Sequence, residues 1–268
     1  MSVDYSAVTE RQQKVWSLGD YGRVGSLLSW MGECLVQQLD IHSDERVLDI
    51  AAGNGNASLP AARRFADVLA TDYVPELLAE AERRAEADGV VLRTQVADAQ
   101  ALPFAAGEFD VVMSTIGAMF APDQQAVSRE MLRVSRPGGR IGMANWTPDS
   151  TVGDMFRAVG KRVPPPPGVQ PAVVWGSEER VTELLGEGCR DLRMTRRTCA
   201  WRYPSAAACL AYFQAWYGPV AAAFTAVGEE GRGDLEDELL SVFDSHNTTD
   251  DGTLAMDVTY LEVVGVRA

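Results

Sequence analysis

The chain has 268 residues, 46% of them hydrophobic, and this composition is enough to bury a large core. Its formal net charge is −14, from 24 basic and 38 acidic side chains. Because an acidic surface repels phosphate backbones, nucleic acid is disfavoured as a partner. No apolar run is long enough to span a bilayer, and the polar, charged start does not look like a signal peptide. We therefore expect a cytoplasmic protein without a membrane partner.

The cysteines agree with that expectation. All four lack a CxxC partner and a metal-ligand spacing. We expect reduced thiols, no disulfide framework and no bound metal.

The first half of the chain alternates between helical and strand patterns. Helices are expected over 8–16 and 27–39, separated by a glycine-rich stretch over 17–25. Apolar segments then predict strands over 46–50, 68–72, 90–98, 109–115 and 140–146. Between them, helices are predicted over 57–65, 75–87 and 123–134, and a turn at PGG (137–139). Short apolar strands that alternate with helices are typical of a parallel sheet covered on both faces.

The second half is less regular. A helix is predicted over 154–163, ended by a proline run, and Ser177 is a good N-cap for a helix over 177–185. Strands are expected over 191–203 and 253–268, with helices over 205–227 and 234–243 between them. We divide the chain into N-terminal helices with a lid (1–45), a ligand-binding core (46–203), a helical cap (204–250) and a final core strand (251–268).

One loop of the predicted sheet has the features of a ligand site. In VLDIAAGNGN (47–56) a strand that carries Asp49 runs into a loop with Gly53 and Gly55. Ligands of doubly wound sheets bind beyond the carboxyl ends of the strands, and two further acids, Asp72 and Asp98, also stand at strand ends. Asp72 follows Gly53 by 19 residues, close to the usual spacing of an acid that binds both ribose hydroxyls. The loop therefore predicts a ligand that contains a ribose.

Five segments carry a resemblance to a known family: VLDIAAGNGN (47–56), ATDYVPELL (70–78), VADAQALPF (96–104), FDVVMSTIGAMFAPD (109–123) and MLRVSRPGG (131–139). They resemble class I S-adenosylmethionine-dependent methyltransferases, in the branch that includes ubiquinone- and menaquinone-pathway enzymes and many natural-product methyltransferases. The resemblance is close over 46–146 and looser over 177–197. It implies an α/β fold: a Rossmann-like, doubly wound, seven-stranded sheet with its last strand antiparallel. The helical cap would be inserted between the last strands.

The resemblance also implies how S-adenosylmethionine would bind as the cofactor. Its methionine part would lie over 51–55, its ribose on Asp72, and its adenine near Tyr73 with the amino group at Asp98. Residues 114–116 would lie beside the transferable methyl, and WSLGDY (16–21) resembles a lid that places Tyr21 over the methionine end. The expected cofactor-binding residues are Tyr21, Asp49, Ala51, Gly53, Gly55, Asp72, Tyr73, Asp98, Ala99, Ser114 and Thr115.

The glycine loop departs from the family in one position. The family's loop is commonly GxGxG, and Ala51 replaces its first glycine. A methyl side chain is tolerated there if φ is not positive, so we expect an ordinary backbone conformation at Ala51. A nicotinamide dinucleotide is the competing ligand, but its GxGxxG loop would need glycine where Ser58 stands.

The predicted cap is rich in aromatic side chains, which either pack on the core or line an apolar acceptor pocket. The expected substrate-contacting residues are Ile116, Met119, Phe120, Trp146, Tyr212 and Trp216. Only two histidines exist, and His42 precedes the first strand at the wrong end of the sheet. His246 is either an exposed loop residue or a general base, because it is the only histidine that could reach the site.

The sequence therefore favours a methyltransferase that acts on a small, largely apolar or aromatic molecule by in-line transfer, with natural-product biosynthesis as the expected setting. The alternatives are an S-adenosylmethionine-binding enzyme of the same fold with other chemistry, such as a cyclase, a non-catalytic binder, or a NAD(P)-dependent oxidoreductase. The methylated atom and the oligomeric state are left open.

Overall fold

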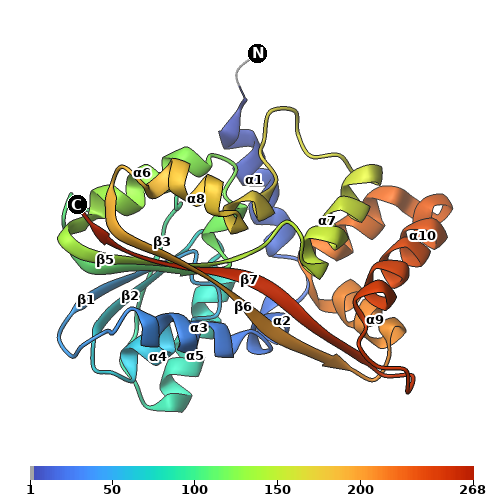
Figure 1. Cartoon of the computed structure of the whole chain (residues 1–268), viewed down its shortest axis with the longest axis horizontal. Helices are drawn as coiled ribbons and strands as arrows, with labels where there is room; N and C mark the ends of the chain where they lie inside the picture. Colours follow the sequence, from blue (N-terminus) through green and yellow to red (C-terminus); the bar gives the residue numbers. More distant parts are fainter. Residues whose placement is uncertain (1–2) are drawn as a thin grey trace.

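The computed structural model describes residues 3–268. A single seven-stranded sheet runs through the molecule in the order β3-β2-β1-β4-β5-β7-β6 (Figure 1). The strands are β1 (Arg46–Ile50), β2 (Asp67–Asp72), β3 (Arg93–Val96), β4 (Phe109–Thr115), β5 (Ser135–Trp146), β6 (Cys189–Tyr203) and β7 (Leu254–Arg267). Strands β1 to β5 are parallel, while β7 pairs antiparallel with β5 and β6. The predicted doubly wound sheet with an antiparallel last strand is confirmed.

Helices cover both faces of this sheet. They are α1 (Tyr5–Trp16), α2 (Tyr21–Ser26), α3 (Ser29–Gln38), α4 (Ser58–Ala62), α5 (Pro75–Asp88), α6 (Gln124–Val134), α7 (Thr151–Arg162), α8 (Glu178–Leu185), α9 (Ala206–Trp216) and α10 (Gly218–His246), with short 3-10 turns at Ala118–Phe120 and Ala172–Gly176. Figure 1 shows α3, α4 and α5 on one face, α6 and α8 on the other, and α7, α9 and α10 gathered beyond one end. The helices α9 and α10 lie between β6 and β7 in the chain, where the cap was expected.

The alternation of side chains along β1 explains why both faces are covered. Leu48 and Ile50 join one apolar cluster, to which α6 contributes Met131. Val47 points the other way and joins a second cluster with Leu35 of α3. Because both faces of the strand are apolar, both need helices to remove them from water.

Several element boundaries differ from those predicted. PGG lies inside β5 as an irregularity: the pairing with β4 jumps from Ser135 to Arg140, so the residues between them bulge out. The strand predicted over 90–98 is only four residues long, and the glycine-rich stretch 17–25 contains α2. The helix predicted over 205–227 is interrupted at Tyr217, which forms a β-bridge with Gly19.

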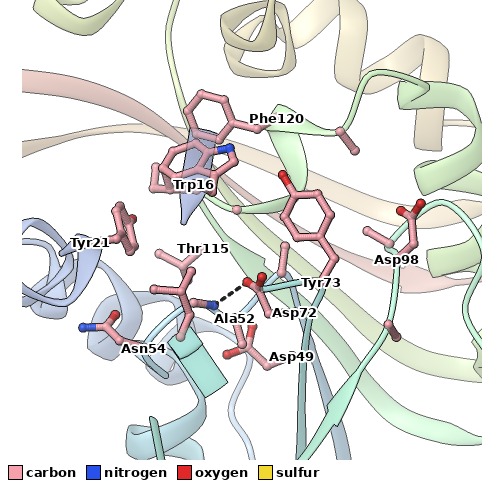
Figure 2. A pocket seen from close by; sticks show the side chains of 18 of the residues that line it. Trp16, Tyr21, Asp49, Ala52, Asn54, Asp72, Tyr73, Asp98, Thr115 and Phe120 are labelled. Atoms are coloured by element: carbon pink, nitrogen blue, oxygen red, sulfur yellow. Dashed lines mark hydrogen bonds between the residues drawn. The ribbon is translucent and has the colours of Figure 1, made fainter. Parts of the chain in front are cut away.

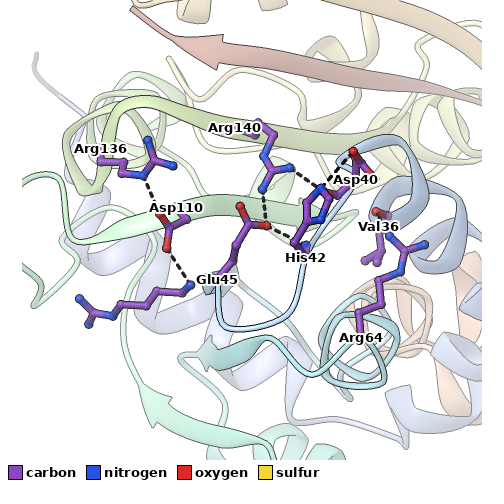
Figure 3. A network of polar contacts seen from close by, with 9 residues as sticks. Val36, Asp40, His42, Glu45, Arg64, Asp110, Arg136 and Arg140 are labelled. Atoms are coloured by element: carbon purple, nitrogen blue, oxygen red, sulfur yellow. Dashed lines mark hydrogen bonds and ion pairs between the residues drawn. The ribbon is translucent and has the colours of Figure 1, made fainter.

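The amino ends of the parallel strands carry a network of ion pairs (Figure 3). Arg140 of β5 pairs with Glu45, whose carboxylate also accepts from the backbone N–H of His42. The imidazole of His42 is exposed and lies 3.2 Å from Asp40. This network is at the edge of the sheet opposite the strand carboxyl ends, as the sequence indicated for His42. Within residues 3–268, no helix is long and apolar enough to cross a membrane.

Candidate active site

A cavity opens at the carboxyl ends of β1, β2 and β4 (Figure 2). This is the edge of the sheet where doubly wound folds bind ligands. Of the residues named from the sequence, the cavity is lined by Tyr21, Asp49, Ala51, Gly53, Asp72, Tyr73, Asp98, Ala99, Thr115, Ile116 and Phe120. The structure thus brings most of the expected site residues together from six separate segments.

Asp72 closes β2 and is buried at the floor of the cavity. Its Oδ2 accepts from the backbone N–H of Gly53 and its Oδ1 from that of Val74, both at 2.9 Å. Burial raises the pKa of this carboxyl to about 6, although the two backbone hydrogen bonds oppose the shift. A carboxylate has about four lone-pair sites, so Asp72 can accept from two ligand hydroxyls while it holds the loop.

Asp49 lies one layer deeper. The Ser58 hydroxyl donates to its Oδ2 at 2.6 Å, while its Oδ1 is buried without a partner within residues 3–268. Burial raises the pKa of Asp49 to about 7, and the nearby Asp72 carboxylate adds to the shift. The cavity floor therefore concentrates negative charge where water is excluded.

The backbone of the loop corrects one expectation. Ala51 has φ = 51°, in the left-handed region, so the prediction of an ordinary conformation there was wrong. A Cβ added to Gly117 would lie only 1.9 Å from the carbonyl oxygen of Ala51, which is too close for any side chain. The loops after β1 and β4 therefore approach closely at this point, and only glycine fits at position 117. Ile116, in the β4 loop, also has a positive φ of 66°. Two residues with side chains thus hold a conformation that costs each about 1 kcal/mol or more.

The two loop glycines serve different contacts. A Cβ on Gly53 would lie 3.3 Å from the Tyr21 ring, whereas a Cβ on Gly55 would lie 3.2 Å from Ala81 of α5. Both glycines have positive φ. Gly53 therefore lets the ring of Tyr21 approach the loop, while Gly55 lets α5 pack and does not line the cavity.

Several polar residues at the site were not named from the sequence, and two of them, Gln100 and Gln13, hold α1 in place. Gln100 donates to Asp98 and, at 2.9 Å, to the Thr9 hydroxyl of α1, and its Oε1 accepts from the backbone N–H of Asp123. Gln13 of α1 donates to the Tyr73 carbonyl. These bonds fasten α1 across the cavity mouth. No local pattern signals them, because Thr9 and Gln100 are 91 residues apart.

Trp16, at the end of α1, was also not named as a site residue. Its indole makes edge-to-face contacts with the rings of Tyr21, Phe120 and Tyr217, at centroid distances of 5.5, 4.8 and 5.7 Å. In Figure 2 Trp16 lies above Thr115, between Tyr21 and Phe120. The segment expected to be a lid therefore supplies an aromatic wall over the cavity.

Behind that wall lies a second, smaller cavity. It shares Trp16, Tyr21 and Ile116 with the first and continues to Trp146 and Tyr217. All of its lining residues are apolar or aromatic. The second, apolar cavity and the first, more polar cavity share a wall, and this arrangement suits a reaction between two ligands bound side by side.

Besides Gly55, four of the expected cofactor- and substrate-contacting residues line neither cavity. Ser114 is buried and donates to the Ile50 carbonyl at 2.7 Å, and Met119 is part of the core. Tyr212 packs on Tyr203, and Trp216 stacks under the Arg23 guanidinium at 4.2 Å. Their assigned contacts with cofactor or substrate stay predictions.

His246 also lies outside the residues that line either cavity. It ends α10, and its Nε2 is 2.7 Å from Oδ2 of Asp154 in the first turn of α7. The imidazole therefore links two helices of the cap. Within residues 3–268 no group of three or more His, Cys, Asp or Glu side chains is placed to hold a metal.

Comparisons with known proteins agree with this geometry. Residues 47–139 match a family model described as a methyltransferase domain. An uncharacterised protein of Mycobacterium tuberculosis is 41% identical over 234 residues, which cover 84% of this chain and 85% of that protein. Demethylmenaquinone methyltransferase of Thermus thermophilus is 35% identical over 145 residues, which cover 53% of this chain and 66% of that protein.

Solved structures share the fold. The YcgJ protein of Bacillus subtilis superposes with a TM-score of 0.60 at 18% identity, over 87% of this chain and 96% of that one. The cyclase SpnF superposes with a TM-score of 0.56 at 16% identity, over 89% and 80% of the two chains. At these identities the likeness concerns the fold alone.

Proposed function

This chain belongs to the class I S-adenosylmethionine-dependent methyltransferases, and we propose that it methylates a small, largely apolar or aromatic molecule. The observation that carries the acceptor class is the second cavity, whose lining is apolar or aromatic throughout. The net charge of −14 argues against a nucleic-acid acceptor. A role in natural-product biosynthesis and a cytoplasmic setting stay predictions.

The residues of the first cavity suit S-adenosylmethionine. Asp72 presents a buried carboxylate for two ribose hydroxyls, and Asp98 stands beside Tyr73 where the adenine would lie. Two buried polar atoms of the lining, Asp49 Oδ1 and Thr115 Oγ1, have no partner within residues 3–268. An unpaired buried polar group costs about 1–3 kcal/mol, so a ligand with matching polar groups would be stabilised there.

The bound donor supplies a methyl group that is already activated by a sulfonium. What remains for the protein is to align the acceptor and to exclude water. Tyr21, Trp16 and Ile116 stand between the two cavities, and we assign them to positioning both molecules at the point of transfer. The α1 lid, fastened through Gln100 and Gln13, would close the site to solvent.

Two measurements test this function together. Calorimetry with S-adenosylmethionine and, separately, NAD should show binding of the first alone. Mass spectrometry of small aromatic molecules incubated with protein and donor should show a gain of one methyl group. Binding of NAD without binding of S-adenosylmethionine would contradict the assignment of S-adenosylmethionine as the methyl donor.

A cyclase is the second candidate, because SpnF shares the fold. The same mass spectrometry separates the two reactions. A cyclase would convert its substrate without change of mass and without consuming the donor, whereas a methyltransferase would release S-adenosylhomocysteine.

A further inference from the structure

We propose that Tyr21 and Tyr217 hold the acceptor's oxygen as an anion, so that the acceptor is a phenol or enol on an uncharged, apolar ring. This inference rests on the proposed function, because it takes the second cavity to be the acceptor site. It goes further in naming the reacting group and the residues that bind it.

The composition of the second cavity excludes several acceptor classes. Its lining contains no Asp, Glu, His, Lys or Arg. Besides the one oxygen that Tyr21 and Tyr217 can serve, a carboxylate or phosphate on the acceptor would therefore lack a cationic partner, and an ammonium group would lack an anionic one. Because an unpaired charge in an apolar cavity is strongly disfavoured, the body of the acceptor must be neutral.

The same composition leaves the protein without a general base at this place. An alcohol of ordinary acidity would keep its proton and react poorly. A phenol or enol can lose its proton to solvent before the site closes. The acceptor's own acidity would then replace a protein base, provided that the cavity stabilises the resulting anion.

Two hydroxyl groups can provide that stabilisation. Tyr21 begins α2 and Tyr217 stands between α9 and α10, and both rings pack on the indole of Trp16 and line the second cavity. Both rings contact the same indole, at centroid distances of 5.5 and 5.7 Å, so the two tyrosines lie on one wall of the cavity. Burial raises the pKa of both phenols well above the usual value. Both therefore stay protonated at neutral pH and remain hydrogen-bond donors.

Two neutral donors in an apolar cavity are a suitable site for a single oxygen anion, because hydrogen bonds to a charged group are strong at low dielectric. Tyr21 also lines the first cavity, so the oxygen would be held at the boundary with the donor. The oxygen then bonds to the methyl carbon as the carbon–sulfur bond breaks, and the electron pair of that bond neutralises the sulfonium.

The experiment uses protein saturated with S-adenosylhomocysteine and 4-nitrophenol as the probe, because the nitrophenolate ion is coloured and the phenol is not. Titration of the bound probe should show a pKa below its value in water. Tyr21→Phe and Tyr217→Phe should each weaken binding of the nitrophenolate by roughly tenfold to a hundredfold, the loss of one hydrogen bond to a charged group. Binding of 4-nitroanisole, which cannot ionise, should be unchanged.

Tyr203→Phe is the matched control, since this tyrosine at the end of β6 lines neither cavity and the substitution should leave both probes unaffected. Equal weakening of nitrophenolate and nitroanisole in the two variants would overturn the proposal, because the cavity would then be merely apolar. Normal binding of S-adenosylhomocysteine with no binding of nitrophenol would also overturn it while sparing the proposed function. Failure to bind S-adenosylhomocysteine at all would instead overturn the proposed function.

Discussion

At the scale of single residues, the candidate site depends on charge and backbone conformation at the ends of three strands. Asp72 holds the loop after β1 through Gly53 and the turn after β2 through Val74. Ala51 and Ile116 hold left-handed conformations where the loops after β1 and β4 meet. Strain of this kind persists only where surrounding contacts over-determine it.

Asp72→Ala should lower the affinity for S-adenosylmethionine by at least tenfold. The variant loses hydrogen bonds from the ribose hydroxyls to a charged group, each worth about 1.5–3 kcal/mol. Calorimetry measures the loss, with Asp67→Ala, at the exposed start of the same strand, as the control. Equal affinities in wild type and the Asp72 variant would mean that the ribose lies elsewhere.

Ala51→Gly should leave the fold intact and raise the free energy of unfolding by up to about 1 kcal/mol, because glycine adopts φ = 51° without steric cost. Ala52→Gly is the matched control: its backbone φ is not positive, so glycine only adds freedom to the unfolded chain and should destabilise by about 0.5–1 kcal/mol. Denaturant unfolding of both variants checks the opposite signs. Destabilisation of both would show that the methyl group of Ala51 contributes more through packing than it costs in strain.

At the scale of elements, the cap packs into the main apolar cluster through side chains such as Phe213, Leu239 and Phe243, and specific contacts join it to the lid and to α7. The start of α2 meets the α9–α10 junction through the hydrogen bond from the Asp20 N–H to the Trp216 carbonyl, and Trp16 packs against Tyr217. The end of α10 meets α7 through His246 and Asp154. The lid and the cap therefore share the wall of the second cavity, and the position of one affects the other.

His246→Ala distinguishes a base from a helix contact. If His246 is a general base, its removal should lower turnover by roughly 10²–10⁴-fold. The contact with Asp154 instead leads us to expect turnover within a few-fold of wild type and a loss of about 1 kcal/mol in stability. Asp154→Ala should then have the same effect on stability, which thermal unfolding measures. A large loss of turnover in the His246 variant alone, with unchanged donor affinity, would restore its role as a base.

At the scale of the whole molecule, a strongly acidic chain buries two of its carboxyls, Asp49 and Asp72, in the candidate site. The net charge of −14 makes further negative charge unfavourable, and Asp49 and Asp72 are also shielded from water. Burial raises their pKa values from 3.8 to about 7 and about 6. The donor-free fold therefore stores electrostatic strain at the place where the donor binds.

This strain predicts a pH dependence with a defined sign. Between pH 4 and pH 7 these two carboxyls are ionised in the unfolded chain but still bind protons in the folded chain. Because the folded state binds more protons, the free energy of unfolding decreases as the pH rises through this window. The melting temperature of the donor-free protein should be a few degrees higher at pH 5.5 than at pH 7.5, and Asp49→Asn should reduce the difference. Affinity for the donor should have the opposite pH dependence. It should decrease as the pH drops below about 6, because a protonated Asp72 accepts hydrogen bonds poorly. A melting temperature that rises with pH would contradict the assignment.

The sequence alone determined the features that depend on local pattern. The alternation of apolar strands and helices specifies a covered parallel sheet, since each pattern has its own period. The acids and glycines at strand ends indicate a ribose-binding edge, because parallel strands bring their carboxyl ends to one side. Asp72 and Gly53 could be named from the printed residues, and the structure joins them by a hydrogen bond.

Only the tertiary structure decided the features that depend on contacts between distant segments. Ala51 takes a positive φ in a loop whose carbonyl lies against Gly117, and no propensity of alanine foretells it. Gln100 reaches Thr9 across 91 residues, and Trp16 meets Phe120 and Tyr217 from three parts of the chain. The second cavity exists only where these segments converge. Its shape and its two phenols follow from packing, which sums many weak contacts that no single stretch of sequence contains.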